Sequence, residues 1–321
     1  MTRDIQVLLS SYNGAPFITA QLASLRAQTA APRMKVLVRD DGSSDGSVDL
    51  VRDFEPGDMA VDVVQGRNVG VRASFLALMK AADDNCRYFF LCDQDDVWDA
   101  DKVAVAVTAL EGFADDDLPA LYCGRSVVTH ADLMPIGPTD DAPRGPSFRN
   151  ALVQNIAPGH TMAMNVALLR LARQTMEPDK IMMHDCWLYL LATGLGTVIF
   201  DSAPHARYRL HGDNDTKYQV NGPRRALLAL RRLLTDDRAQ WTSQARLFSQ
   251  VAGASLQPAD HAAMVAFLDQ STCARRVNFL RAFGLTYQRG RPIAASLLFL
   301  VGRYRDDRRR VVVAESGCLA G

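Results

Sequence analysis

The feature that most constrains this chain is a regular alternation of short apolar runs with helical segments over its first third. The helical segments, in which apolar residues recur at helical spacing, cover residues 17–28, 48–54, 73–82 and 101–110. The apolar runs that precede them, each short enough for one buried strand, are residues 5–10, 35–39, 61–64 and 88–92. This order predicts an α/β fold with a mostly parallel central sheet and helices on both faces.

Polar turns close three of the predicted strands. Tyr12 lies in the turn after the first strand, Asp40 and Asp41 follow the second, and the acidic run 93–96 (DQDD) follows the fourth. In open α/β sheets, ligands bind beyond the carboxyl ends of the strands. We therefore expect these turns to line one crevice, although they are far apart in the chain.

The middle of the chain is less regular. Residues 132–147, rich in Pro, Gly and Asp, predict a loop. Helical spacing returns at residues 163–173 and 184–192, and a short strand is expected at 197–200.

Asp93 and Asp95 form a D-x-D pattern directly after the apolar run YFFLC. Two carboxylates on a tight turn can converge on Mg²⁺ or Mn²⁺, which completes its coordination with substrate phosphates and water. A solvated acidic turn without a metal is the alternative reading of the same pattern.

Three further polar positions allow both a functional and a structural reading. The Asp41 carboxylate can bind the base or ribose of a nucleotide, or it can belong to a turn whose Asp45 caps the next helix. Asp185, which follows His184, can take a proton from an alcohol as a general base, or it can only favour the start of a helix. His211 can bind a metal or a phosphate, or it can be structural.

Several classes of protein are excluded by missing motifs. The chain has no G-x-x-x-x-G-K-[ST] phosphate loop, no G-x-G-x-x-G after the first strand and no G-x-S-x-G elbow. Its six cysteines form no C-x-x-C pair, which excludes a zinc ribbon and favours reduced thiols. We expect a cytoplasmic protein, because the sequence shows neither the pattern of a signal peptide nor an apolar stretch of membrane-spanning length.

Taken in order, the motifs between residues 5 and 214 resemble the inverting glycosyltransferase family 2, which has the GT-A fold. The matching elements are SYNG, DDGSSDGS, NVG, DQDDVW followed by DK, GHT, HD and YRLHGDN. Each motif alone is weak, but the ordered set is specific. The form DQDDVW…DK is most similar to the bacterial rhamnosyltransferase-like branch.

The resemblance implies which residues bind the nucleotide. Ser10 and Tyr12 would line the pocket for base and ribose. Asp41 would bind the base, and Asp93 would lie near the ribose. The donor would therefore be a nucleotide-diphospho-sugar.

The resemblance also implies the residues of the reaction. Asp95 would hold Mg²⁺ or Mn²⁺, and His211 would approach the metal or the diphosphate. Asp185 would be the catalytic base in a single displacement with inversion, with His184 or His160 as the next candidates.

The chain departs from the family pattern near the expected sugar and acceptor subsites. Ser74 stands where the branch often has Asn, and the usual G-C-T turn is GHT here. The HD motif is followed by Cys186 rather than Trp, with Trp187 next. We assign the acceptor or sugar subsite to His160, Thr161, His184 and Trp187. These departures leave the identity of the sugar open.

The function expected from the resemblance is transfer of a sugar, with dTDP-rhamnose as the first choice of donor, to a glycan or lipid-linked acceptor in bacterial polysaccharide synthesis. Two alternatives remain. One is a hexosyltransferase that uses UDP-glucose or UDP-galactose. The other is a non-catalytic relative that binds nucleotide sugars or glycans, although both Asp95 and Asp185 are present.

The charge distribution divides the 321 residues into two regions. We expect a catalytic domain at 1–220 and an Arg-rich helical extension at 221–321. The net charge is zero, yet residues 221–310 contain 16 Arg, no Lys and only 6 Asp. Arg interleaved with Leu predicts helices that either lie on an anionic membrane or pack on the catalytic domain. No nucleic-acid motif accompanies these arginines, so we expect no nucleic-acid partner.

Overall fold

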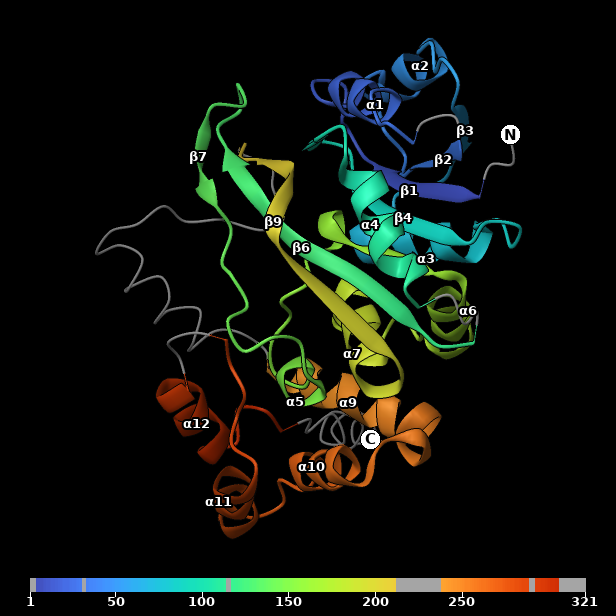
Figure 1. Ribbon diagram of the computed structural model, residues 1–321. Helices are drawn as coiled ribbons and strands as arrows, with labels where there is room; N and C mark the ends of the chain where they lie inside the picture. Colours follow the sequence, from blue (N-terminus) through green and yellow to red (C-terminus); the bar gives the residue numbers. More distant parts are fainter. Residues whose placement is uncertain (1–3, 31–32, 114–116, 212–237, 289–291, 306–321) are drawn as a thin grey trace, which may run out of the picture.

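The computed structural model describes residues 4–30, 33–113, 117–211, 238–288 and 292–305 (Figure 1). The Leu- and Arg-rich segment at 221–237 and the last arginines at 308–310 lie outside the described residues. The final motif of the sequence is described only up to His211.

The first half of the sheet is parallel, as predicted. Strand β1 pairs in parallel with β2 on one side and with β4 on the other, and β2 pairs in parallel with β3. The observed bounds are β1 Ile5–Ser11, β2 Met34–Asp40, β3 Ala60–Gln65 and β4 Tyr88–Asp93. Strands β1, β2 and β4 are buried and form nearly continuous apolar runs, which is why the sequence located them; β3 lies at the edge of the sheet and is only partly buried.

The second half of the sheet is mixed, in the order β4-β8-β6-β9-β5, with β7 beside β6. Strands β6 and β9 are parallel to each other, whereas β8 is antiparallel to both β4 and β6. Strands β5 and β7 add further antiparallel pairs. The bounds are β5 Val97–Trp98, β6 Ala120–Thr129, β7 Pro135–Pro138, β8 Ala163–Asn165 and β9 Thr197–Arg209.

Four of these strands were not expected from the sequence: β5, β6, β7 and β8. Strand β7 lies inside the stretch 132–147, which was expected to be a loop. Strand β8 is only three residues long and runs directly into α6, so its residues were assigned to the helix. The Asn165 side chain ends the strand and begins the helix, because it accepts a hydrogen bond from the Leu168 amide at 3.0 Å.

Helices cover both faces of the sheet, as expected for an α/β fold. The side chains of Ile5, Val7 and Leu9 point to one face and belong to the core with α1 and α4. Leu8 points to the other face and belongs to the core with α3, α6 and α7. The bounds are α1 Ile18–Arg26, α2 Ser47–Arg52, α3 Val71–Ala81, α4 Lys102–Glu111, α6 Val166–Thr175 and α7 His184–Leu195.

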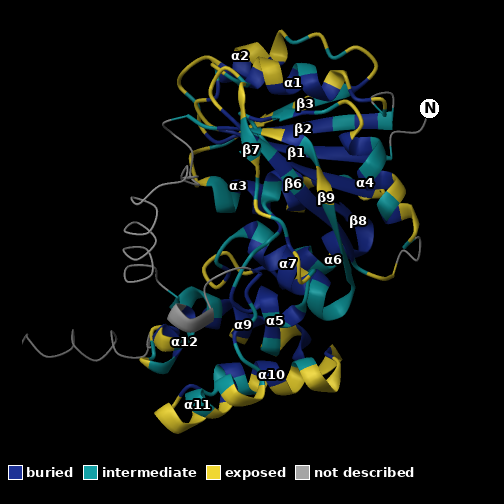
Figure 2. Ribbon diagram, turned by 60° about the vertical axis from the view of Figure 1, so that its left-hand side comes forward, coloured by how far each residue is buried: buried dark blue, intermediate teal, exposed yellow. Residues whose placement is uncertain are grey.

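The C-terminal extension is helical and packs below the sheet against α5 and α7 (Figure 1). Phe248 of α9 is buried between the rings of Phe148 and Trp187, with centroid distances of 5.3 and 6.3 Å. Figure 2 shows buried residues on the inner faces of these helices and exposed residues along α10 and α11. The bounds are α5 Phe148–Ala151, α9 Ala239–Ala252, α10 Pro258–Leu268, α11 Cys273–Ala282 and α12 Pro292–Leu300.

Helix α12, which contains the longest apolar run of the extension, is also part of this packing. Its Phe299 is fully buried and contacts the rings of Phe267, Phe279 and Tyr304. Among the described residues, no helix combines the length and the apolar character that crossing a bilayer requires. The described part of the extension therefore shares one core with helix α7.

A substitution at Gly194 tests whether α7 and the extension form one cooperative core. A Cβ at this position would lie 2.7 Å from Phe248 Cζ and 3.2 Å from Leu256 Cδ2. We expect Gly194→Ala to lower the free energy of unfolding by about 1–3 kcal/mol through overpacking. Urea denaturation measures this change. Gly112→Ala is the control, because Gly112 has a helical φ of −62° and is exposed. This substitution should leave the free energy of unfolding unchanged or raise it. If both variants change the free energy of unfolding equally, the shared core is contradicted.

Candidate active site

The carboxyl ends of β1, β2 and β4 lie level with one another, as the sequence predicted. Ser10 is opposite Asp93 in the register between β1 and β4, and Ser11 is opposite Asp40 in the register between β1 and β2. The three polar turns that follow these strands therefore meet at one edge of the sheet.

Gln94 connects the turn after β1 to the acidic turn after β4 through hydrogen bonds. Its Oε1 accepts hydrogen bonds from Ser11 Oγ at 2.9 Å and from the Tyr12 amide at 2.8 Å, and its Nε2 donates to the Tyr12 carbonyl at 2.9 Å. Gly14 leaves the space for this side chain, since a Cβ there would lie 2.1 Å from Oε1. The Tyr12 ring itself is exposed. Sequence reasoning treated Gln94 as a spacer, and no local signal marked its role.

Asp41 is buried and makes several hydrogen bonds within the protein. Its carboxylate accepts from the amides of Val69 at 3.0 Å and Gly70 at 2.9 Å, and from Arg39 Nη1 at 2.5 Å. The two amides belong to the N-x-G turn, so Asp41 holds that turn against β2. Direct contact between Asp41 and a base stays a prediction.

Arg39 connects Asp41 to the serines at the start of the site. Its Nη1 also donates to Ser74 Oγ at 2.9 Å, and Ser74 Oγ lies 2.6 Å from Ser10 Oγ. Ser74, which replaces the Asn common in the related branch, thus forms the link between α3 and the end of β1. No local pattern marked the role of Arg39, because its contact with Ser74 joins two different elements.

The two residues expected at the metal, Asp95 and His211, are in contact although 116 positions separate them. Asp95 Oδ2 lies 2.6 Å from His211 Nε2, and the two side chains are 15% and 11% exposed. Phe17 stacks on the His211 ring with a centroid distance of 4.5 Å. Arg209 Nε donates to the Asp95 carbonyl at 3.0 Å. The neighbouring strand β9 therefore brings His211 to the acidic turn.

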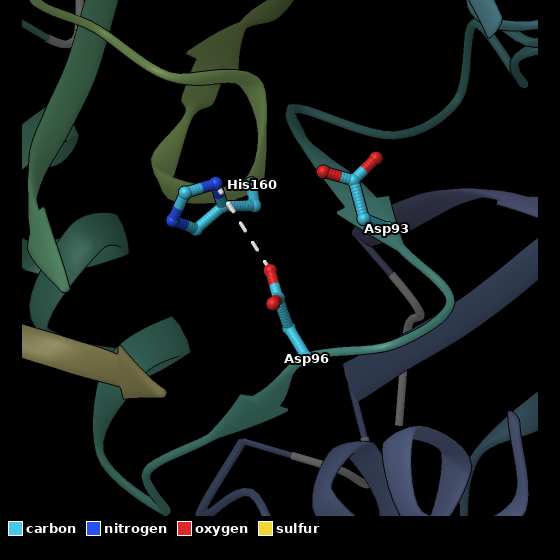
Figure 3. A group of neighbouring side chains, drawn as sticks. All are labelled: Asp93, Asp96 and His160. Atoms are coloured by element: carbon cyan, nitrogen blue, oxygen red, sulfur yellow. Dashed lines mark ion pairs between the residues drawn. The ribbon is translucent and has the colours of Figure 1, made fainter. Parts of the chain in front are cut away.

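A second group of potential metal ligands consists of Asp93, Asp96 and His160 (Figure 3), in which one ligand atom of each lies within 4.8 Å of the others. Asp96 is 0% exposed, and its Oδ2 lies 4.0 Å from His160 Nδ1 and has no hydrogen-bond partner among the described residues. Burial, followed by the charges of Asp95 and Asp93, raises the pKa of the Asp96 carboxyl well above its usual range. Sequence reasoning did not identify Asp96, and it placed His160 in the sugar subsite.

His160 is neutral at physiological pH, because burial and then the charge of Lys102 lower its pKa to about 3. Its Nε2 lies 3.0 Å from Ser126 Oγ, and its ring stacks on Tyr208 at 5.0 Å. If Nε2 carries the proton, Nδ1 offers its lone pair towards Asp96. Lys102 Nζ donates to the His160 carbonyl at 2.8 Å, and burial lowers the pKa of Lys102 to about 8.

Asp185 lies in the first turn of α7, with a hydrogen-bond donor at each carboxylate oxygen. Its Oδ1 accepts from the Cys186 amide at 2.7 Å, and its Oδ2 accepts from Asn155 Nδ2 at 2.8 Å. The side chain is half-buried. Sequence reasoning missed Asn155, which lies in the loop before the GHT turn.

The other residues expected at the sugar or acceptor subsite lie around the GHT turn at 159–161, except for Trp187. The His184 ring is buried and stacks on Phe75 at 4.2 Å, and burial lowers the pKa of His184. Thr161 is also buried, and its Oγ1 donates to the Pro158 carbonyl at 2.8 Å. Trp187 is buried in the core against the extension. Contact of these side chains with a sugar or an acceptor stays a prediction.

The turn at residues 159–161 connects the two halves of the site. His160 belongs to the group with Asp93 and Asp96. Gly159 lies beside the start of α7, since a Cβ there would be 2.9 Å from His184 Nε2 and 3.8 Å from Asp185 Cβ. The acidic turn and Asp185 therefore flank one short segment of backbone.

Comparison with known proteins agrees with this architecture. Residues 6–171, about half of the chain, match the family model described as glycosyl transferase family 2. The dTDP-rhamnosyl transferase RfbG of Shigella flexneri is 28% identical over 106 residues, which span 32% of this chain and 36% of that protein, only about a third of its length.

Solved structures share the fold. Residues 1–349 of S. aureus TarS match with a TM-score of 0.59 and 16% identity, over 95% of this chain and 80% of that one. The same protein in complex with UDP-GlcNAc matches with a TM-score of 0.59 and 14% identity, over 95% and 90%. From the matched family, the ordered motifs and the GT-A fold, it follows that this chain belongs to glycosyl transferase family 2 and is a glycosyltransferase.

Proposed function

We propose that this glycosyltransferase moves a sugar, with inversion, from a nucleotide diphosphate to a hydroxyl of a glycan or lipid-linked acceptor in bacterial polysaccharide synthesis. The observation that carries the proposal is the meeting of Asp95 and His211 at the carboxyl edge of the sheet, with Asp185 beside the adjacent GHT turn. Similarity to a dTDP-rhamnosyl transferase over about a third of the chain supports dTDP-rhamnose as the first donor to test. UDP-glucose and UDP-galactose are the alternative donors.

Asp185 has the chemistry that the transfer requires. As the acceptor oxygen attacks the anomeric carbon, the bond from that carbon to the diphosphate oxygen breaks, and the hydroxyl proton passes to a carboxylate oxygen of Asp185. The bonds from Cys186 and Asn155 occupy one acceptor position on each oxygen. A carboxylate has about four such positions, so two remain for the acceptor hydroxyl. A single displacement needs no protein nucleophile.

The carboxylates and imidazoles of this site are suitable ligands for Mg²⁺ or Mn²⁺. A bound cation would neutralise the negative charge that develops on the diphosphate leaving group. We propose that Asp95 and His211 hold it, because both side chains are partly exposed at the sheet edge. The group of Asp93, Asp96 and His160 is the second candidate, favoured by the unpaired Oδ2 of Asp96. The buried ammonium of Lys102 beside this second group disfavours a further cation there.

The proposed activity is tested with a panel of nucleotide sugars and Mn²⁺, with release of the nucleotide diphosphate as the measurement. We expect turnover with dTDP-rhamnose. Asp185→Asn should keep the affinity for the donor and lose about 10²-fold or more in turnover, because it removes the base and retains the size of the side chain. Failure of every donor in the panel, or normal turnover by Asp185→Asn, would contradict the proposal.

The two candidate metal sites are distinguished by a matched pair of variants. Asp95→Asn should weaken Mn²⁺ binding about 10-fold or more, since ligands of a site and their neighbours contribute that much to affinity. Asp96→Asn should leave Mn²⁺ affinity near that of the unmodified protein. Isothermal titration with Mn²⁺ in the presence of nucleotide diphosphate measures both. The reverse ranking would assign the metal to Asp96, and full activity in EDTA would remove it from the reaction.

We further propose that the enzyme is cytoplasmic and contacts the anionic inner face of the membrane through its C-terminal extension. The excess of arginine in residues 221–310 supports this. Two apolar side chains at the end of α12 are also exposed, Leu297 by 58% and Val301 by 72%, close to Arg303 and Arg305. Exposed apolar area and basic charge act together at a lipid surface, where each basic residue contributes about 1 kcal/mol.

Flotation with anionic liposomes tests the membrane proposal. The full chain should float at low salt and be released at high salt, because charge attraction is screened. Replacing Leu297 and Val301 together by Gln should reduce flotation. Val265→Gln is the control, since Val265 is an exposed apolar residue on α10. If the full chain stays with the unbound protein at low salt, the extension acts only through packing.

A further inference from the structure

We propose that Asn155 is a positioning residue that holds the Asp185 carboxylate in the orientation needed to accept the proton of the acceptor hydroxyl. The inference rests on the proposed function, in which Asp185 is the base. Asn155 belongs to the loop between α5 and the GHT turn, 30 positions before Asp185 in the chain.

The orientation of the Asn155 amide is determined by its two partners. Its Oδ1 accepts a hydrogen bond from the Ala157 amide at 3.0 Å, and its Nδ2 donates to Asp185 Oδ2 at 2.8 Å. A backbone amide can only donate, and an ionised carboxylate can only accept. Rotation of the side-chain amide by half a turn would therefore break both bonds, so only one orientation fits.

The loop that carries Asn155 is itself fixed by neighbouring elements. The adjacent Gln154 Oε1 accepts hydrogen bonds from Asn150 Nδ2 and from the Gln288 amide, both at 3.0 Å. Ala157, on the other side, is fully buried. The backbone that carries Asn155 is therefore held in place on both sides, and this restrains the position of its side-chain amide.

The second donor to Asp185 comes from the helix that carries it. The Cys186 amide donates to Oδ1 at 2.7 Å. One donor on each oxygen fixes both rotation of the side chain and the plane of the carboxylate. The Cys186 contact depends only on the start of α7, whereas the Asn155 contact reaches across from another element. Loss of Asn155 thus leaves Asp185 with a single anchor, and the carboxylate can turn away from the acceptor.

Two substitutions of Asn155 separate hydrogen bonding to Asp185 from support of the loop. Asn155→Ala removes both contacts. Asn155→Asp keeps the shape and the acceptor for the Ala157 amide, but it places a carboxylate against Asp185. We expect both variants to lower kcat about 10- to 100-fold, the effect of misplacing a reacting group, with the donor KM unchanged and Asn155→Asp at least as impaired as Asn155→Ala. A loop-supporting role predicts the opposite ranking.

Gln154→Ala and Asp185→Asn complete the experiment. Gln154→Ala loosens the loop but leaves the Asn155–Asp185 hydrogen bond available, so its loss in kcat should be smaller than that of Asn155→Ala; an equal loss would overturn the inference. Adding Asn155→Ala to Asp185→Asn should cause no further loss, because residues that act through one interaction are not additive. Nucleotide affinity, measured for each variant, reports an intact fold. Normal turnover by Asp185→Asn refutes the proposed base, whereas an inactive Asp185→Asn with fully active Asn155 variants refutes only the role of Asn155.

Discussion

The acidic turn at residues 93–96 is held in place by hydrogen bonds from three sides, and the geometry of the site depends on that restraint. Gln94 connects the turn to the end of β1. Arg209 binds the Asp95 carbonyl, and its own amide donates to Asp96 Oδ1 at 3.3 Å. The short strand β5 continues the turn and pairs with β9. Ionised carboxylates this close in sequence repel one another. The hydrogen bonds stabilise one conformation of the turn against that repulsion.

The same contacts decide how far each carboxylate is exposed to solvent. Asp96 is enclosed beside His160, whereas Asp95 keeps some exposure next to His211. Burial favours the neutral form of an acid and of an imidazole alike, which is why the pKa of Asp96 is raised and the pKa of His160 is lowered. Neighbouring residues of one motif thereby acquire different chemistry. The partly exposed pair, Asp95 and His211, is the more accessible of the two to a ligand that arrives from solvent.

The extension contributes to the site through α7. The first turn of this helix carries Asp185, and the helix continues into the core, where Trp187 contacts Phe248 of α9. Gly194 near its other end allows α9 to approach closely. Because packed interiors transmit displacement rather than absorb it, a shift of α9 would be felt at the start of α7. The helices after residue 238 are therefore part of the packing that supports the first turn of α7, which carries Asp185.

The sequence by itself determined the fold class, the first four strands, their helices and the family. It could do so because buried parallel strands are continuous apolar runs and because the polar turns of this family have recognisable residues at fixed spacing. It also paired Asp95 with His211 through the resemblance, and the two side chains are in contact. The three-residue strand β8 carries too little pattern to be separated from the helix that follows it.

Only the tertiary structure decided which partners each site residue has. Gln94, Arg39, Asp96 and Asn155 have no local pattern that marks them, because their hydrogen bonds join segments that are distant in the chain. Trp187, which adjoins the HD motif in sequence, points into the core because one side of α7 faces the extension. Local periodicity indicates which face of a helix or strand a residue occupies. The contacts of a polar side chain depend instead on how strands and helices pack, and that packing is a property of the whole fold.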